Sequence, residues 1–460
     1  MESNWANTTT ESIRKSPFLR ILVIGFLVLL FHIPTGMIQN VIRERQATRN
    51  EAVQEVTGKW GQSQAVVGPS ITVPYVKRWT EQREKGEPKT HSEIRYATFL
   101  PETLQAHGKI DSEARYRGIF KVPVYQMAVA LTGVFAKPDL SQWQVAAEDI
   151  LWDRAYLSIR ISDARAITNQ ALLEWNGEKV NFLPGAGEAT RKNSGIHADL
   201  KDRLAVDSLK FSCTLNLNGS EKALFAPFGK ETRVDLESNW SDPSFQGAWL
   251  PSQRTVTQDG FKATWSIPFL GRNYPQQWMS AEAGDDLVSA SLFGVSLISP
   301  VDHYRMAERS MKYVTLFLAL TFVVLWLFEV LIKVRIHLVQ YLLVGAGLCL
   351  FYLLELSIAE HIGFNIAYVI AASAIILLVS SYCVAVLNSR TRAIIVGTIV
   401  AVLYGFLYVL LRDQDYALLL GSVGLFFILA AIMFMTRNVD WYSGQVASYF
   451  SGGGDADQVE

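Results

Sequence analysis

The chain has 460 residues, of which 50% are apolar, and a formal net charge of −1. A near-neutral chain without a block of like charges is not typical of nucleic-acid-binding proteins, so we expect no nucleic acid among its partners. The stretch 39–312 mixes charged, aromatic, Gly and Pro residues, whereas the stretch 313–435 is almost continuously apolar. A soluble fold cannot bury so much continuous apolar sequence, which therefore predicts a membrane protein.

The first predicted element is a membrane helix over residues 17–38. Its apolar core, Ile21–Phe31, is preceded by Arg14, Lys15 and Arg20. A signal peptide needs a small-x-small cleavage site after such a core, and the sequence that follows does not have this pattern. We therefore interpret the segment as an uncleaved membrane anchor.

Residues 39–312 are predicted to form a large β-rich domain. The polar segment Val41–Val56 has few helix breakers, so it extends the first helix outward as a stalk. Beyond the stalk the apolar period changes to two. In Ser208–Leu217 every second residue is apolar, which is typical of a strand with one buried face, and Asn176-Gly177 and Asn218-Gly219 are typical turn sequences. We expect a mostly antiparallel, sandwich-like domain with no regular alternation of strands and helices.

Five more membrane helices are predicted after this domain. Each is close to the ~20 residues needed to cross a hydrocarbon layer of ~30 Å. Their connections are only a few residues long, so neighbouring helices must be antiparallel. The predicted spans are 313–332, 338–358, 364–387, 393–411 and 416–435.

The short loops predict the orientation of the helices, because basic loops stay in the cytoplasm. Basic residues recur in alternate loops. In a bacterial inner membrane, this pattern places the N-terminal segment 1–16 and the C-terminal tail 436–460 in the cytoplasm, and residues 39–312 in the periplasm. The basic positions are Arg14, Lys15, Arg20, Lys333, Arg335, Arg390, Arg392 and Arg437. Six further basic residues flank the large domain and would lie on the outer side of the membrane, against the rule. The rule is weak for a long translocated domain. These residues are Arg43, Arg45, Arg49, Arg305, Arg309 and Lys312.

A search for catalytic and metal-binding patterns predicts no catalytic residue, no metal site and no cofactor. The histidines of the large domain are not at helical or hairpin spacing from another His or a Cys, and the sequence has no His-Glu-x-x-His motif. It has no Gly-x-Ser-x-Gly nucleophile elbow either. The only candidate acids for a hydrolase are neighbouring carboxylates such as Glu148-Asp149 or Asp285-Asp286. Acids side by side in a turn are typically solvated.

Three ionisable residues inside the spans are the candidate functional groups. A charge left in lipid costs about 2.5 to 3.5 kcal/mol even on lenient insertion scales. By helical rise, Glu355 lies near the outer end of the third span and His32 at a similar depth in the first, whereas Glu329 lies near the inner end of the second. One interpretation is that His32 and Glu355 reach the interface or support packing. The other is a His32–Glu355 pair facing a polar cavity, as in a proton-coupled carrier.

Six motifs, in order along nearly the whole chain, resemble the CreD inner-membrane proteins. Three lie in the large domain: VGPSITVPY at 67–75, RGIFKVPVY at 117–125, and PSFQG at 243–247 followed by Leu250-Pro251. Three lie near or in the membrane: RSMKY at 309–313, QYLLVG at 340–345 with FYLLE at 351–355, and YALLLGS at 416–422 running to TRNVDWY at 436–442. One departure is visible at 356–361, where Leu-Ser-Ile-Ala precedes Glu360-His361 instead of a direct Leu-Ser-Glu-His.

The resemblance implies a cell-envelope integrity protein of the bacterial inner membrane, typically produced under an envelope-stress regulator, and it implies no catalytic residues. The preferred hypothesis is therefore a non-enzymatic protein whose periplasmic domain binds an envelope component or a partner protein. The alternative is a proton-coupled transporter or channel that uses the intramembrane Glu and His residues, although no inverted repeat between the halves is apparent. The expected partners are membrane lipids, with cell-envelope components and other inner-membrane proteins as further candidates.

Overall fold

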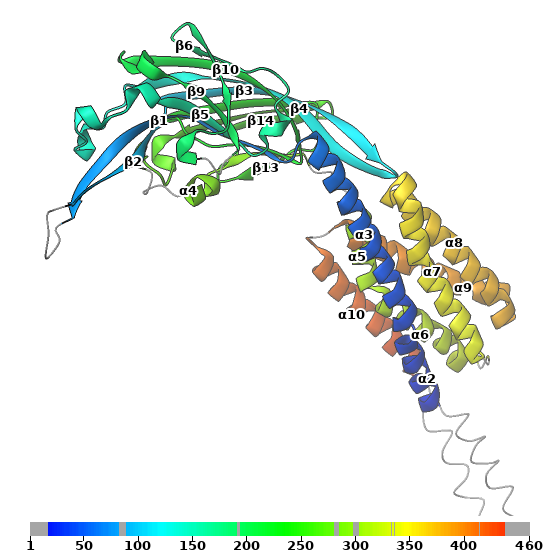
Figure 1. The fold of residues 1–460 in the computed structure, drawn as a ribbon. Helices are drawn as coiled ribbons and strands as arrows, with labels where there is room; N and C mark the ends of the chain where they lie inside the picture. The colour runs from blue at the N-terminus through cyan, green and yellow to red at the C-terminus, as the bar shows by residue number, and fades with distance from the viewer. Residues whose placement is uncertain are drawn as a thin grey trace, which may run out of the picture. The chain divides into compact units, whose positions relative to one another are not determined.

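The computed structural model describes residues 17–81, 89–190, 194–279, 285–297, 303–332, 334, 336–413 and 415–437. Among these residues, six helices are long and apolar enough to cross a membrane. In the sequence, a large β domain follows the first of them and precedes the other five (Figure 1). The predicted fold class is thus confirmed. The predicted cytoplasmic segment 1–16 and all but two residues of the predicted tail 436–460 lie outside the described residues.

The chain divides into two compact units, one formed by Met1–Thr48 with Val301–Glu460 and the other by Arg49–Pro300. The N-terminal helix belongs to both. It is interrupted once: α2 covers Pro17–Leu30 and α3 covers His32–Trp60. Pro34 explains the break, because it has no N–H and its ring crowds the carbonyl group of Leu30, four residues earlier. Beyond the break the helix continues without interruption through the predicted stalk.

The β unit contains two sheets that share one hydrophobic core. The described strands form two sheets. The nine-stranded sheet has the path β13-β17-β11-β1-β5-β9-β8; in addition β2 pairs with β1, and β16 pairs with β2. The eight-stranded sheet has the order β14-β15-β12-β3-β4-β10-β6-β7. The pairs β1–β11 and β12–β3 are parallel, and the other described pairs are antiparallel. A short helix, α4 (Asp285–Ala290), lies in the same unit.

The strands of the first sheet are β1 Gln64–Glu81, β2 Lys89–Phe99, β5 Tyr156–Ile161, β8 Leu183–Pro184, β9 Gly195–Asp199, β11 Lys222–Phe225, β13 Ser244–Gly247, β16 Gln277–Met279 and β17 Phe293–Ser296. Those of the second are β3 Thr103–Arg117, β4 Phe120–Ala136, β6 Leu172–Trp175, β7 Glu178–Asn181, β10 Ser208–Ser220, β12 Glu231–Ser238, β14 Gln253–Thr257 and β15 Gly260–Pro268. The second sheet alternates buried and solvent-facing residues along β3, β10 and β12, so one of its faces covers the core and the other faces solvent.

Strand β10 confirms the predicted alternation: its apolar residues from Leu209 to Leu217 are all buried. The predicted turn at Asn218-Gly219 is wrong, because both residues remain in β10 and pair with Gln126 and Tyr125 of β4. A Cβ atom on Gly219 would lie 2.3 Å from Cζ of Tyr125, so glycine is needed here to accommodate the neighbouring ring. The other Asn-Gly pair, Asn176-Gly177, does form the turn between β6 and β7, with φ angles of 49° and 86°.

The helical unit contains α2, the N-terminal part of α3, and α5 His303–Lys312, α6 Val314–Ile332, α7 Leu338–Ile362, α8 Phe364–Leu387, α9 Arg390–Arg412 and α10 Ala417–Thr436. Helices α7, α8 and α9 pack in sequence (Figure 1). The apolar runs predict the centres of these helices, but hydrogen bonding continues past the apolar residues, so α7 ends at Ile362 and α9 begins at Arg390.

The predicted end of the large domain at residue 312 requires a correction. The ten residues before it form α5, which packs against α7 and α9 and belongs to the helical unit. The reason is its buried face, Tyr304, Ala307, Ser310 and Met311, whose helical spacing matches a helix packed along one side.

Candidate functional site

Glu329 lies in α6 and forms an ion pair with Arg20 of α2. Its Oε1 also accepts a hydrogen bond of 3.2 Å from the backbone N–H of Ile336. The side chain of Glu329 is 7% exposed, whereas that of Arg20 is 35% exposed. Because an unpaired charge at this depth would be costly, the pair serves to join the anchor helix to the bundle.

His32 is exposed and joins α3 to the start of α6. Its Nδ1 lies 3.0 Å from the carbonyl oxygen of Val28, and its Nε2 lies 3.3 Å from the hydroxyl group of Thr315. Within the described residues its hydrogen bonds do not include Glu355, so the structure does not form the hypothesised His32–Glu355 pair. Similar depth along two helices places residues at one level, but it does not decide which faces meet.

Glu355 is completely buried in α7. Its Oε2 accepts a hydrogen bond of 3.1 Å from the Ser310 hydroxyl group, and its Oε1 has no hydrogen-bond partner among the described residues. Ser310 belongs to α5 and is itself fully buried. A buried carboxyl oxygen without a partner is rare in proteins and costs free energy, so Glu355 is an unusual polar group of the bundle.

An aromatic cluster occupies the turn of α7 that precedes Glu355. The ring of Phe351 lies 5.0 Å from that of Tyr352, 5.3 Å from that of Tyr368 and 4.5 Å from that of Tyr404. The Tyr368 hydroxyl group donates a hydrogen bond of 2.6 Å to the backbone carbonyl of Tyr404, which ties α8 to α9. All of these side chains are buried, so Glu355 lies beside a rigid, mainly apolar core.

Three more polar contacts fix the surroundings of Glu355, and none was predicted from the sequence. Glu360 accepts a hydrogen bond of 2.8 Å from the Tyr304 hydroxyl group, and the Arg45 guanidinium lies 3.7 Å away. The Arg309 guanidinium donates to the backbone carbonyl of Leu410 at 3.2 Å. Arg45 and Arg309 are among the basic residues that the orientation rule leaves unexplained. Their contacts within the bundle give both a structural role on that side.

The β unit has a separate candidate site, a groove of about 440 Å³ on the solvent face of its eight-stranded sheet. Two rows of side chains cross the strands β4, β3, β12 and β15 at this place. The first row is Ala130, His107, Asp235 and Thr264, and the second is Ala128, Lys109, Glu237 and Lys262. The hollow forms where the short alanine side chains leave space, and the longer side chains line it.

The groove carries charges of both signs. Asp235 accepts a hydrogen bond of 2.6 Å from the Thr264 hydroxyl group, bonds the Arg233 guanidinium at 2.9 Å, and lies 3.3 Å from Nδ1 of His107. Burial raises the pKa of Asp235, but the hydrogen bonds from Arg233 and Thr264 outweigh it and leave the pKa below its usual range. A second hollow of about 450 Å³ adjoins the first and shares Lys109, Glu237 and Lys262 with it, so the combined groove is elongated.

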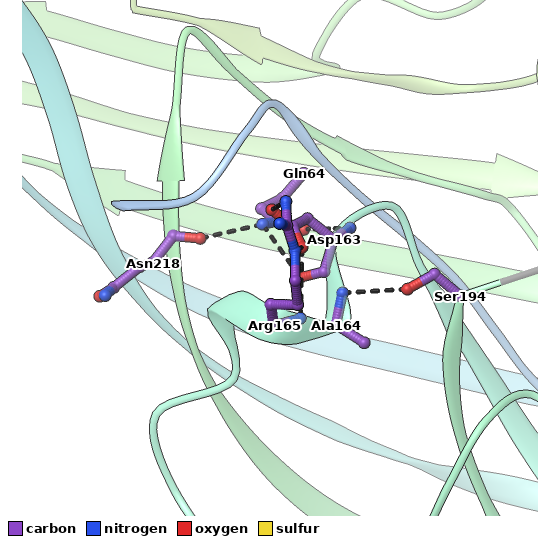
Figure 2. A network of polar contacts seen from close by, with 6 residues as sticks. All are labelled: Gln64, Asp163, Ala164, Arg165, Ser194 and Asn218. Carbon is purple, nitrogen blue, oxygen red and sulfur yellow. Dashed lines mark hydrogen bonds and ion pairs between the residues drawn. The ribbon is translucent and has the colours of Figure 1, made fainter. Parts of the chain in front are cut away.

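A second polar network, shown in Figure 2, is structural. The side-chain amide of the fully buried Gln64 donates to the carbonyl oxygen of Asn218 at 3.0 Å, which joins β1 of one sheet to β10 of the other. Asp163 accepts hydrogen bonds from both the guanidinium and the backbone N–H of Arg165, and these bonds lower the pKa of Asp163. These hydrogen bonds connect the two sheets, which is a structural role for the network.

Among the residues that the structure describes, no three His, Cys, Asp or Glu side chains lie close enough together to hold a metal ion. Cys213 is buried in the core of the β unit, and burial raises the pKa of its thiol to about 12. At neutral pH the thiol therefore stays protonated, and it is poorly suited to act as a nucleophile.

Comparison with known proteins places the chain in a family. The family model "Inner membrane protein CreD" matches residues 16–442. The chain is 34% identical over 433 residues to the inner membrane protein CreD of Escherichia coli (strain K12), which covers 93% of this chain and 95% of that protein. The described residues contain six apolar helices and an intervening β domain, and the chain belongs to the CreD family of multi-pass inner membrane proteins.

Proposed function

We propose that this protein maintains the integrity of the cell envelope under envelope stress and does so without catalysing a reaction. Its β domain faces the periplasm and binds an envelope component or a partner protein, while both termini lie in the cytoplasm. Family membership supports an inner-membrane location, and the alternation of basic and non-basic loops supports the orientation.

The elongated groove on the eight-stranded sheet is the observation that carries the binding proposal. It has a small-residue floor at Ala128 and Ala130, and its rim presents Lys109, Lys262 and Glu237. Such a groove suits an extended polar ligand that carries both charges, because each charged group of the ligand meets its opposite along the rim. A mixture of charges also disfavours a uniformly charged polymer.

Complementation of a strain that lacks its CreD protein tests this function. The strain's tolerance of detergent and of cell-wall antibiotics is compared for the wild type, Ala128→Trp and the control Ala136→Trp. Both alanines are exposed and lie on the same face of β4, but only Ala128 lines the groove. We expect the wild type and Ala136→Trp to restore tolerance and Ala128→Trp to fail at equal protein level. Full tolerance with Ala128→Trp would contradict binding in the groove.

A proton-coupled transporter or channel is the second candidate, and the unpartnered Oε1 of Glu355 is the observation that favours it. A proton carrier needs a carboxyl group that can change its protonation state, which Glu355→Gln removes with little change in shape. If the protein carries protons, Glu355→Gln abolishes tolerance although the protein inserts and folds. If Glu355→Gln restores tolerance as well as the wild type does, the carrier function is excluded.

A further inference from the structure

An apolar crevice of about 430 Å³ lies between α6, α9 and α10. It is lined by aliphatic and aromatic side chains of all three helices, including Leu327 of α6, Ile399 of α9 and Ala431 of α10. No described side chain that lines it carries a charge or a hydrogen-bonding group. The crevice belongs to the helical unit alone and does not depend on the groove in the β unit.

Helix α10 leaves this crevice open to the surrounding lipid. Within Ala417–Thr436 no side chain is buried, whereas α6 and α9 each bury a face in the bundle. A well-packed helix pair would close such a space by interlocking small and large residues. Helix α10 therefore borders the bundle loosely, with an apolar space behind it.

Positive charge gathers at one end of the crevice. Helix α9 begins at Arg390, and α10 ends one residue before Arg437, so these ends lie on the same side of the membrane. Ile395 and Met435, which line the crevice, are three residues from Arg392 and two residues from Arg437, respectively. The Arg437 guanidinium lies over the Phe434 ring at 3.9 Å. A guanidinium group can bind phosphate through two parallel N–H donors.

We propose that the crevice binds an acyl chain of an anionic phospholipid, whose phosphate group is held by Arg392 and Arg437. The apolar lining matches a hydrocarbon chain, and the arginines at one end match the negative headgroup. A peptide segment fits less well. Its backbone N–H and C=O groups would need hydrogen bonds, and the lining supplies none.

The test measures lipid retained by the full-length protein after exchange into a mild detergent, by native mass spectrometry. Phosphatidylglycerol and phosphatidylcholine with identical acyl chains are the two probes. We expect retention of phosphatidylglycerol, and about tenfold weaker retention in Ala431→Trp, the change expected when roughly two methylenes are excluded. The matched control is Ala430→Trp, because Ala430 is its exposed neighbour and does not line the crevice.

The double variant Arg392→Gln/Arg437→Gln tests the headgroup without filling the crevice, so it remains informative if Ala431→Trp folds poorly. We expect it to reduce retention of phosphatidylglycerol to the level of phosphatidylcholine, and we expect the control Arg412→Gln, at the opposite end of α9, to leave retention unchanged. Equal retention of both lipids by the wild type would overturn the headgroup assignment. Unchanged lipid retention in Ala431→Trp would overturn the acyl-chain site. If a second copy of the chain occupies the crevice instead, the wild type is a dimer that dissociates in Ala431→Trp without loss of lipid, and this result would also overturn the site.

Discussion

The Ser310 hydroxyl group donates a hydrogen bond of 3.1 Å to Oε2 of Glu355, and this bond joins α5 to α7 in the interior of the helical unit. Both side chains are fully buried. Helix α5 is the segment through which the chain returns from the β unit to the membrane helices. The bond therefore fixes α5, the first helix after the β unit, against α7.

Ser310→Ala is expected to destabilise the helical unit by about 1 to 3 kcal/mol, because it leaves Glu355 buried without a hydrogen bond. The thermal unfolding of the purified protein in detergent measures the effect, with Ser357→Ala, an exposed position of α7, as the control. The double variant Ser310→Ala/Glu355→Met removes both polar partners and is expected to recover most of the loss. Additive losses in the double variant would show that the hydrogen bond contributes nothing to stability.

Removing either partner of the Arg20–Glu329 pair should have unequal effects. In Arg20→Ala, Glu329 is left at 7% exposure without its cation, which should cost about 3 kcal/mol. In Glu329→Ala, Arg20 is already 35% exposed and can extend to water, so the loss should be about 1 kcal/mol. Thermal unfolding in detergent ranks the two variants. A larger loss in Glu329→Ala would contradict this account.

Gly219→Ala should destabilise the β unit by about 1 to 3 kcal/mol, because the added methyl group meets the Tyr125 ring. Gly177→Ala serves as a comparison, since nothing lies within 4 Å of the Cβ position there and only the φ of 86° opposes the change. Combining Gly219→Ala with Tyr125→Leu should relieve the clash. Tryptophan fluorescence follows unfolding and gives the free energy of unfolding of each variant. If the effects of the two substitutions simply add, the two residues are not in contact and this account is contradicted.

Acid should weaken the β unit through Asp163. The hydrogen bonds from Arg165 lower the pKa of Asp163 in the folded state. A lowered folded-state pKa adds stability that is present above the unfolded-state value, about 3.9 for Asp, and is lost as the pH falls through the folded-state value. In Asp163→Asn the loss of stability between about pH 5 and pH 2 should therefore be smaller than in the wild type. Asp207→Asn, at an exposed position, serves as the control.

The proposed orientation predicts which cysteine variants a membrane-impermeant maleimide can reach. All three native cysteines are buried, and burial raises the pKa of Cys213 to about 12, so the background reaction should be low. Lys109→Cys, on the groove rim, should react in intact spheroplasts. Ser389→Cys, between α8 and α9, should react only after the membrane is permeabilised. The reverse pattern would overturn the proposed orientation.

Features that depend on local pattern could be predicted from the residues alone. Runs of apolar residues locate the membrane helices because polar side chains are costly in the hydrocarbon core. The alternation in Ser208–Leu217 identifies β10 because one face of that strand is buried. The intramembrane acids Glu329 and Glu355 stand out for the same reason. Arg20 and Ser310, which bond them, do not stand out, because nothing in their own neighbourhood marks them as partners.

Which distant residues meet depends on the folded chain as a whole. The groove requires the parallel pairing of β12 with β3, which brings Asp235 beside His107 across more than a hundred residues of chain. Asn218-Gly219 is a turn by its local preference, but packing against Tyr125 keeps it in a strand. Local sequence determines the conformational preferences of a segment, whereas pairing and packing depend on free energies summed over the whole fold, which no single segment contains.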